Sequence, residues 1–336
     1  MAGGSVTLSD LARMAGVSIA TVSRALNDHT SVRWDTKEQI WALAKKHRYP
    51  LEKRRSANSL GAIGCITLVL PIPQGRDTML DDPFLLELVA GIGDAARERH
   101  CDLHLSHVLA RSDTDIFRMM ASDRSDGVIF LGQSSLHDAF NELANKESRF
   151  AVWGAQMPNQ KYCSVGSSNE AGGRRATSHL LRIGRNRIIF LGDSEAPEVV
   201  QRLQGYREAM VKFALDLDPC LQVPAHFTVE SGEAAIDALI SRNIHFDGVV
   251  AASDLIAIGA IRSLENHGIS VPDDVSVIGY DDIPIARYNR PALSTITQDT
   301  RRAGRALISK ILDRGEGRMR AERLPTDLMV RQSCGG

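Results

Sequence analysis

The sequence contains little that could cross-link or anchor the chain. Its 336 residues include five cysteines, at positions 65, 101, 163, 220 and 334, and no CxxC pair. An odd number of scattered thiols argues against a disulfide framework or a zinc site and fits a reducing cytoplasm. The chain has no apolar run of about 18 residues, the length of a membrane span, and no export signal at its start. We therefore expect a cytoplasmic protein with no membrane partner.

Catalytic signatures are also missing. The sequence has no nucleophile elbow, no P-loop and no histidine cluster at zinc spacing. Gly91 and Gly93 fall inside a predicted helix and not in a turn after a strand, so they do not form a dinucleotide fingerprint. We expect no enzyme activity, and hence no catalytic residue, metal or cofactor.

Charge is nearly balanced over the whole chain but unevenly distributed. The net charge is −1, yet residues 1–62 carry a net charge of +5 and the remainder −6. A basic segment ahead of an acidic body is typical of a small nucleic-acid-binding domain joined to a different module. The charge pattern alone is weak support, because solvated helices are often locally basic.

The stretch from Val6 to Asn27 predicts two short helices around a tight turn. Thr7 and Asp10 have the spacing of a capping box, and Gly16 supplies the backbone freedom of a sharp turn. Ser18 can cap the second helix. The predicted inward-facing residues are Leu8, Leu11, Ala12, Ala15, Val22, Ala25 and Leu26.

The other face of the second helix is predicted to meet solvent or DNA. Small and hydroxylated side chains at a helix start let the backbone approach a phosphate. Arg24, one turn further on, can donate two hydrogen bonds to a guanine base. A helix-turn-helix places its recognition helix in the major groove in this way. The alternative is an ordinary α-rich domain, in which two amphipathic helices flanking a glycine are common.

The segment TLSDLARMAGVSIATVSRALN resembles the headpiece of the lactose/galactose-repressor family (LacI/GalR), and residues 32–49 resemble its third helix, with Ile40, Leu43 and Ala44 facing inward. The resemblance implies an all-α headpiece over residues 1–50 that binds double-stranded operator DNA. The DNA-contacting residues that it implies are Thr7, Ser18, Ile19, Ala20, Thr21, Ser23, Arg24, Asn27 and Leu60.

Residues 51–62 are predicted to form a hinge or linker, because they are basic, polar and poor in core residues. In the family this segment forms a short helix on DNA, and a leucine enters the minor groove. Asn58 stands at the spacing of that leucine, and Leu60 is the nearest substitute. Lys53, Arg54 and Arg55 could hold phosphates, while a merely flexible tether is the alternative.

From residue 63 onward, predicted strands and helices alternate. The apolar runs at 63–70, 127–131, 150–153, 188–191, 248–251 and 275–278 predict buried parallel strands. Amphipathic helices are expected at 84–99, 172–183, 201–215, 256–267 and 300–312. This alternation predicts an α/β core, and its length calls for two doubly wound parallel sheets with a ligand cleft between them.

The core also resembles the same family. The segments that carry the likeness are DPFLLELVAGIGDAA (82–96), residues 167–193, RLQGYREAM (202–210) and residues 251–296. The resemblance implies the two-lobed fold of periplasmic sugar-binding proteins, with three chain crossings. Lobe one is expected at about 63–164 and 296–323, and lobe two at about 165–295 and 324–336.

Six residues are carried over to an effector site. Arg202, at the start of a predicted helix, would grip ligand hydroxyls or a carboxylate, and Asp281, which ends a strand, would accept two hydroxyl bonds. Ser253 stands where the family often has asparagine, and Gly154 where some members have an acidic contact. Phe227, Trp153 and Phe84 are the aromatic candidates, although a buried aromatic is usually a core residue.

We therefore interpret the chain as a regulator, most simply a repressor, whose operator affinity is controlled by a small effector. A two-fold homodimer would match a near-palindromic operator. The tail DLMVRQSCGG has no leucine heptads, which argues against a tail-built tetramer. A sugar inducer is the favoured effector, with a corepressor left open. The competing interpretations are an enzyme and an exported sugar-binding protein, and the latter would need an export signal and no basic headpiece.

Overall fold

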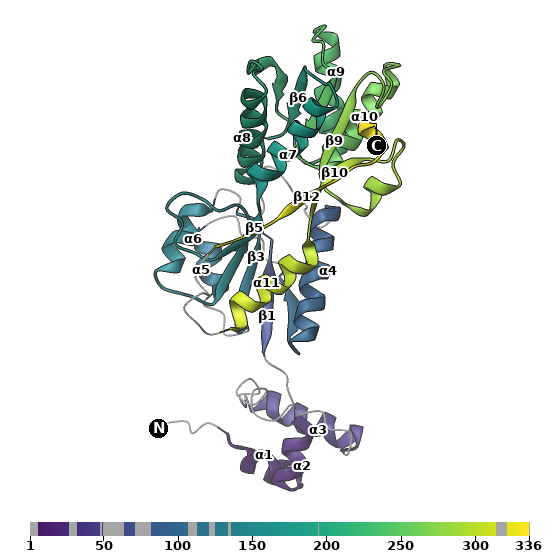
Figure 1. The fold of residues 1–336 in the computed structure, drawn as a ribbon. Helices are drawn as coiled ribbons and strands as arrows, with labels where there is room; N and C mark the ends of the chain where they lie inside the picture. The colour runs from purple at the N-terminus through teal and green to yellow at the C-terminus, as the bar shows by residue number, and fades with distance from the viewer. Residues whose placement is uncertain are drawn as a thin grey trace. The chain divides into compact units, whose positions relative to one another are not determined.

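The computed structural model describes residues 6–26, 32–47, 49, 64–70, 82–106, 113–120, 125–133, 136–193, 195–313 and 321–335. The chain divides into two units, Met1–Gly64 and Cys65–Gly336 (Figure 1). Each unit has its own hydrophobic core.

In the part of the first unit that the structure describes, the chain forms helices α1 (Leu8–Ala15), α2 (Ile19–Leu26) and α3 (Trp34–Lys46). Helix α1 begins at the predicted capping box: the Thr7 hydroxyl accepts the Asp10 N–H, and the Asp10 carboxylate accepts the Thr7 N–H. Gly16 ends α1 with a φ of 67°, in the left-handed region that glycine tolerates best. The unit's core comprises Leu11, Ala12, Val22, Ala25, Val32, Ile40 and Ala44.

The second unit contains two lobes, each built on a six-stranded sheet. The first sheet has the order β11 (Glu322–Leu324), β5 (Ser164–Ser167), β4 (Phe150–Trp153), β3 (Gly127–Leu131), β1 (Cys65–Val69) and β2 (Asp102–Leu105). Helices α4 (Pro83–Glu98) and α11 (Thr300–Leu312) share one apolar cluster with this sheet. Helices α5 (Asp113–Met120) and α6 (His137–Ala144) share another. The sheet is thus covered on both faces, as a doubly wound sheet must be.

The second sheet repeats this strand order. It runs β12 (Thr326–Met329), β10 (Ser294–Gln298), β9 (Ser276–Asp281), β8 (Gly248–Ala251), β6 (Ile188–Leu191) and β7 (Gln222–Val223). Its helices are α7 (Asn169–Arg182), α8 (Pro197–Lys212), α9 (Val229–Ser241) and α10 (Asp254–Asn266), packed with it into one core. The strand pairings are parallel except for that of β12, which runs antiparallel to β10.

The chain passes between the lobes from β5 to α7, from β10 to α11 and from β11 to β12 (Figure 1). These crossings lie within a few residues of the predicted lobe boundaries, but not on them. The predicted boundary at 164 falls on β5, which belongs to the first sheet, and the boundary at 296 falls on β10, which belongs to the second. Both short strands are rich in serine and threonine and therefore lack the apolar run that marked the other strands.

Three helices and several edge strands were not predicted. Helices α5, α6 and α9 were missed, as were β2, β5, β7, β10, β11 and β12. Most of the missed strands are short or lie at the edges, where partial exposure weakens the apolar signal. None of the helices in the described residues has the length and apolarity needed to cross a membrane.

Candidate functional site

The first candidate surface is the outward face of α2. Ile19, Ala20 and Arg24 are exposed, while Thr21 and Ser23 are half-buried. Ser18 caps the helix, because its hydroxyl accepts the Thr21 N–H at 3.0 Å and lies 2.8 Å from the Thr21 hydroxyl. The predicted division of α2 into an inner and an outer face is therefore present. A helix start with exposed small side chains and an arginine one turn on has the chemistry to approach a groove and its phosphates.

The remaining predicted DNA-contacting residues divide into two groups. Thr7 holds the start of α1, where its hydroxyl also donates to the Asp10 carboxylate at 2.6 Å. This hydrogen bond lowers the pKa of Asp10. Asn27, Asn58 and Leu60 lie outside the described residues, as do Lys53, Arg54 and Arg55.

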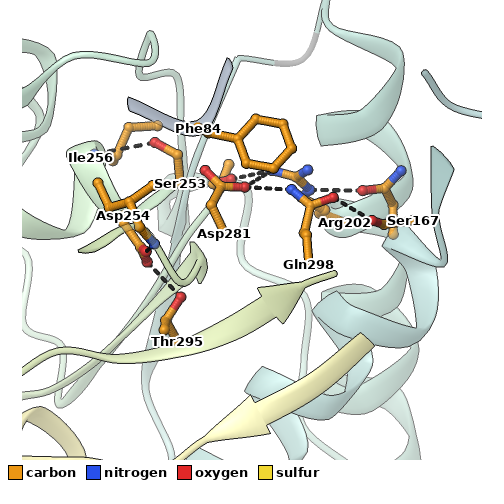
Figure 2. Close-up of polar contacts among 12 residues, drawn as sticks. Phe84, Ser167, Arg202, Ser253, Asp254, Ile256, Asp281, Thr295 and Gln298 are labelled. Carbon is orange, nitrogen blue, oxygen red and sulfur yellow. Dashed lines mark hydrogen bonds and ion pairs between the residues drawn. The ribbon is translucent and has the colours of Figure 1, made fainter. Parts of the chain in front are cut away.

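The second candidate site is a polar cluster buried at the carboxyl ends of strands from both sheets (Figure 2). We call it the interlobe cluster; its members are Ser167, Asn169, Arg202, Tyr280, Asp281 and Gln298. Parallel α/β sheets bind their ligands beyond the carboxyl ends of the strands, so this is the expected position for a site.

Arg202 is the centre of the interlobe cluster. Its side chain is 6% exposed, and its Nε donates to the Asn169 side-chain oxygen at 2.9 Å. A second donor, Nη1, contacts the Ala252 carbonyl and lies 3.9 Å from Asp281 Oδ1. The guanidinium carbon lies 3.7 Å from the centroid of the Tyr280 ring, which places the cation over an aromatic face.

Asp281 ends β9, as predicted, and completes the ion pair. Its Oδ1 accepts a hydrogen bond from Gln298 Nε2 at 2.6 Å, and the amide oxygen of Gln298 in turn accepts the Ser167 hydroxyl. Burial raises the pKa of Asp281 well above its usual value, opposed mainly by the positive charge of Arg202. Such a buried pair offers a donor and an acceptor side by side, the complement of a ligand that carries neighbouring hydroxyl groups.

The position of Arg202 within its helix differs from the prediction. Helix α8 begins at Pro197, so Arg202 lies in the second turn and not at the start. Proline is favoured at the first position of a helix because its missing N–H would have no partner there. Arg202 is therefore held by a formed helix, which packs closely against α7.

The predicted aromatic residues lie on both lobes. Phe84, in the first turn of α4, packs against the cores of both lobes, and its ring centroid lies 5.9 Å from that of Trp153 at the end of β4. Figure 2 draws Phe84 beside the interlobe cluster. Phe227 packs on the core of the second lobe immediately before α9. Trp153 is almost fully buried and so serves the core of its lobe as well.

The Ser253 hydroxyl caps α10, accepting the Ile256 N–H at 3.3 Å. It can still donate its own proton. Gly154 has no side chain to offer, and a Cβ there would lie 2.7 Å from Gln133, whose side chain occupies that space.

Four members of the interlobe cluster escaped the prediction, namely Ser167, Asn169, Tyr280 and Gln298. Asn169 opens α7 and Gln298 ends β10, so each follows or ends a strand in the way that Asp281 does. A search for polar side chains at strand ends would have needed β5 and β10, which their serine- and threonine-rich sequences did not reveal. Tyr280, next to Asp281 in β9, had no such signal, because a tyrosine within a strand is usually a core residue.

Both units of the chain are similar to domains of known proteins. The family model for bacterial regulatory proteins of the lacI family matches residues 7–50, and the model for a periplasmic binding protein-like domain matches residues 177–334. The HTH-type transcriptional regulator CelR of Thermobifida fusca is 33% identical over 339 residues, covering 97% of this chain and 98% of its own. The HTH-type transcriptional repressor PurR of Haemophilus influenzae is 30% identical, over 92% of this chain and 90% of its own.

A solved structure of a regulator is similar to this chain over nearly its full length. The complex of transcriptional regulator CelR with cellobiose aligns over 98% of this chain and 99% of its own, with a TM-score of 0.70 and 31% identity. Because the similarity includes the headpiece as well as the core, it decides against an exported binding protein that would share the core alone. The chain belongs to the lacI family of bacterial regulatory proteins and is a DNA-binding transcriptional regulator with a helix-turn-helix headpiece and a two-lobed core.

Proposed function

We propose that this regulator is a repressor whose operator affinity is controlled by a sugar bound at the interlobe cluster. The observation that carries the proposal is the buried Arg202–Asp281 pair at the carboxyl ends of the strands, beside Phe84 of the other lobe. Arg202 and Asp281 would hold the ligand's hydroxyl groups. Phe84, Trp153 and Phe227 would supply apolar surface for a sugar ring, and the Ser253 proton would be a further donor.

The relatives support a sugar over other ligand classes. The CelR structure was solved as a complex with cellobiose, a neutral disaccharide. The Arg202–Asp281 pair suits such a ligand, because vicinal hydroxyls can accept from the guanidinium and donate to the carboxylate. A corepressor, whose binding would strengthen operator affinity, is the second candidate. Whether the effector is a sugar inducer or a corepressor, we expect the protein to work as a cytoplasmic homodimer without a catalytic step.

On DNA, we assign base reading to Ile19, Ala20, Ser23 and Arg24 of α2. Thr7, Ser18 and Thr21 then hold the helix starts near phosphates, and Asn27 and Leu60 are further proposed contacts. A homodimer would place two α2 helices on two half-sites, and sugar binding would alter their spacing. A coupling of about 1–3 kcal/mol would change operator affinity roughly 5- to 150-fold.

The test is Asp281→Ala in the full chain. We expect normal operator binding and loss of its response to cellobiose, because the variant removes the acceptor for the sugar hydroxyls. Asp327→Ala is the matched control, since Asp327 is an exposed carboxylate on β12 of the same sheet, and it should respond like the wild type. Operator affinity is measured by fluorescence anisotropy with and without sugar. A normal response of Asp281→Ala would refute the assignment of the site.

A further inference from the structure

The backbone that presents Asp281 is strained. Asp281 has a φ of 114° and Asp282 a φ of 57°, so two consecutive residues with side chains lie at positive φ. Residues other than glycine seldom adopt positive φ; aspartate tolerates the left-handed region near 57° better than most, but a φ of 114° lies well outside it and persists only where the surroundings hold it. Because this corner aims the Asp281 carboxylate at Arg202, whatever holds the corner also sets the geometry of the interlobe cluster.

Hydrogen bonds from α10 and β10 hold one side of the corner. The Ile283 N–H donates to Asp254 Oδ2 at 2.9 Å, and the Asp282 N–H donates to the Thr295 hydroxyl at 3.3 Å. That hydroxyl donates in turn to Asp254 Oδ1 at 2.5 Å. Gly279 makes this possible, since a Cβ there would lie 2.2 Å from Asp254 Oδ1. These bonds fix the backbone on both sides of Asp282 but leave its side chain to be held by other groups.

An arginine from the C-terminal tail holds the Asp282 side chain. Arg331 Nη2 lies 2.5 Å from Asp282 Oδ1, and Nη1 donates to the Leu293 carbonyl at 2.7 Å. Both charged side chains are largely buried, at 14% and 7% exposure. The backbone of Arg331 is also fixed, because its N–H donates to the Ser294 hydroxyl at 2.8 Å. The rigid guanidinium fork thus ties the corner to the start of β10 with two separate donors.

A second arginine reaches the same carboxylate from outside. Arg287 Nη2 lies 3.5 Å from Asp282 Oδ2, and its side chain is 61% exposed. Because its guanidinium is exposed to solvent and lies farther from the carboxylate, Arg287 holds Asp282 less firmly than Arg331 does. Arg287 therefore offers a matched control, being the same residue type on the other oxygen of the same carboxylate.

We propose that Arg331 is a positioning residue of the effector site: from the C-terminal tail it holds Asp282, and through the strained corner it keeps Asp281 directed at Arg202. Only the expected effect of Arg331 on sugar binding rests on the proposed function. The positioning itself is a property of the ligand-free protein. The C-terminal tail thus contributes to the geometry of the site, although Arg331 lies about fifty positions beyond Asp281 in the sequence.

Crystal structures of the ligand-free full chain test the positioning directly. Compared with the wild type, Arg331→Gln is expected to lengthen the 3.9 Å separation of Arg202 Nη1 and Asp281 Oδ1 and to move Asp282 out of positive φ. Arg287→Gln should leave both unchanged. Arg331→Lys keeps the charge but has one anchoring atom and should show a smaller displacement. It also serves if Arg331→Gln does not fold. An unchanged corner in the folded Arg331 variants would overturn the proposal.

Cellobiose affinity by calorimetry supplies the functional readout. We expect Arg331→Gln to weaken binding about 10- to 100-fold, by analogy with the loss of a residue that orients the ligands of a metal ion. Operator affinity without sugar should not change, which a general loss of structure would not allow. If Asp281→Ala loses cellobiose binding but Arg331→Gln does not, the positioning role is wrong and the site assignment stands. If Asp281→Ala keeps it, the sugar assignment fails and the crystal comparison still decides the role of Arg331.

Discussion

At the scale of single residues, burial raises the pKa of two aspartates in the second lobe, Asp254 and Asp281. Asp254 is fully buried, and burial raises its pKa to about 7, although hydrogen bonds from Thr295 and Ile283 act in the opposite direction. Nearby Asp282 raises this pKa further and Arg331 lowers it. A carboxyl group that is harder to ionise when folded binds a proton more tightly in the native state than in the unfolded chain.

This proton linkage predicts how stability depends on pH. Between about pH 4, where an unfolded aspartate ionises, and pH 7, the folded form of Asp254 holds more protons than the unfolded form. Stability should therefore fall as the pH rises, by at most about 1.4 kcal/mol per pH unit. Urea midpoints measured from pH 5 to 7 check this. Asp254→Asn should flatten the slope, whereas Asp327→Asn, at an exposed position, should not. An equal slope in Asp254→Asn and the wild type would contradict the linkage.

Arg24 is the residue on which the reading of bases by α2 depends most. It is exposed on the outer face, one turn after the capped helix start. Arg24→Ala should lower the preference for operator over random DNA by about 1–3 kcal/mol, the value of one bidentate base contact. Arg33→Ala removes another exposed arginine of the headpiece and should keep the specificity ratio. Anisotropy titrations on both DNAs measure the ratio, and an unchanged ratio in Arg24→Ala would remove it from base reading.

At the scale of elements, the close contact of α7 with α8 positions Arg202. A Cβ at Gly205 would lie 2.0 Å from the Glu170 carbonyl oxygen, and one at Gly173 would lie 2.0 Å from the Arg202 carbonyl oxygen. The two helix backbones thus touch where Arg202 and Asn169 meet. Glycine is required at these positions because of the space available, since any side chain would push the helices apart.

Gly205→Ala should consequently destabilise the protein by about 1–3 kcal/mol or more, because overpacking at a backbone contact cannot relax cheaply. It should also weaken sugar binding, since Arg202 lies on the displaced helix. Gly93→Ala in α4 is the matched control: its Cβ would have its nearest neighbour at 4.0 Å, so it should be neutral or slightly stabilising. Urea unfolding of both variants provides the comparison, and equal stabilities would show that α8 can shift freely.

At the scale of the whole molecule, a basic headpiece is joined to an acidic core. Contacts of the headpiece with phosphates release counterions from DNA, so operator affinity should fall steeply with salt. A plot of log affinity against log salt concentration should be linear with a negative slope, and Asp281→Ala should have the same slope as the wild type. A flat plot would count against phosphate contacts by the headpiece.

The sequence revealed the local features of the fold because they depend on neighbouring residues. The capping box at Thr7 and Asp10, the turn at Gly16 and the buried runs of β3, β4, β6 and β8 all have their causes within a few positions. The start of α8 was placed too late, because Pro197 lies outside the amphipathic part of the helix. Arg202 and Asp281 themselves came from the family resemblance, not from a pattern in the residues.

The sequence by itself determined that there is a helix-turn-helix, a two-lobed α/β core and a family to which both belong. Only the tertiary structure decided which side chains share the interlobe cluster. Ser167 meets Gln298 from 131 positions away, and Arg331 reaches Asp282 across 49. Such partners are joined by the crossing of strands between two sheets, and hydrogen bonds depend on distances in space that no local periodicity encodes.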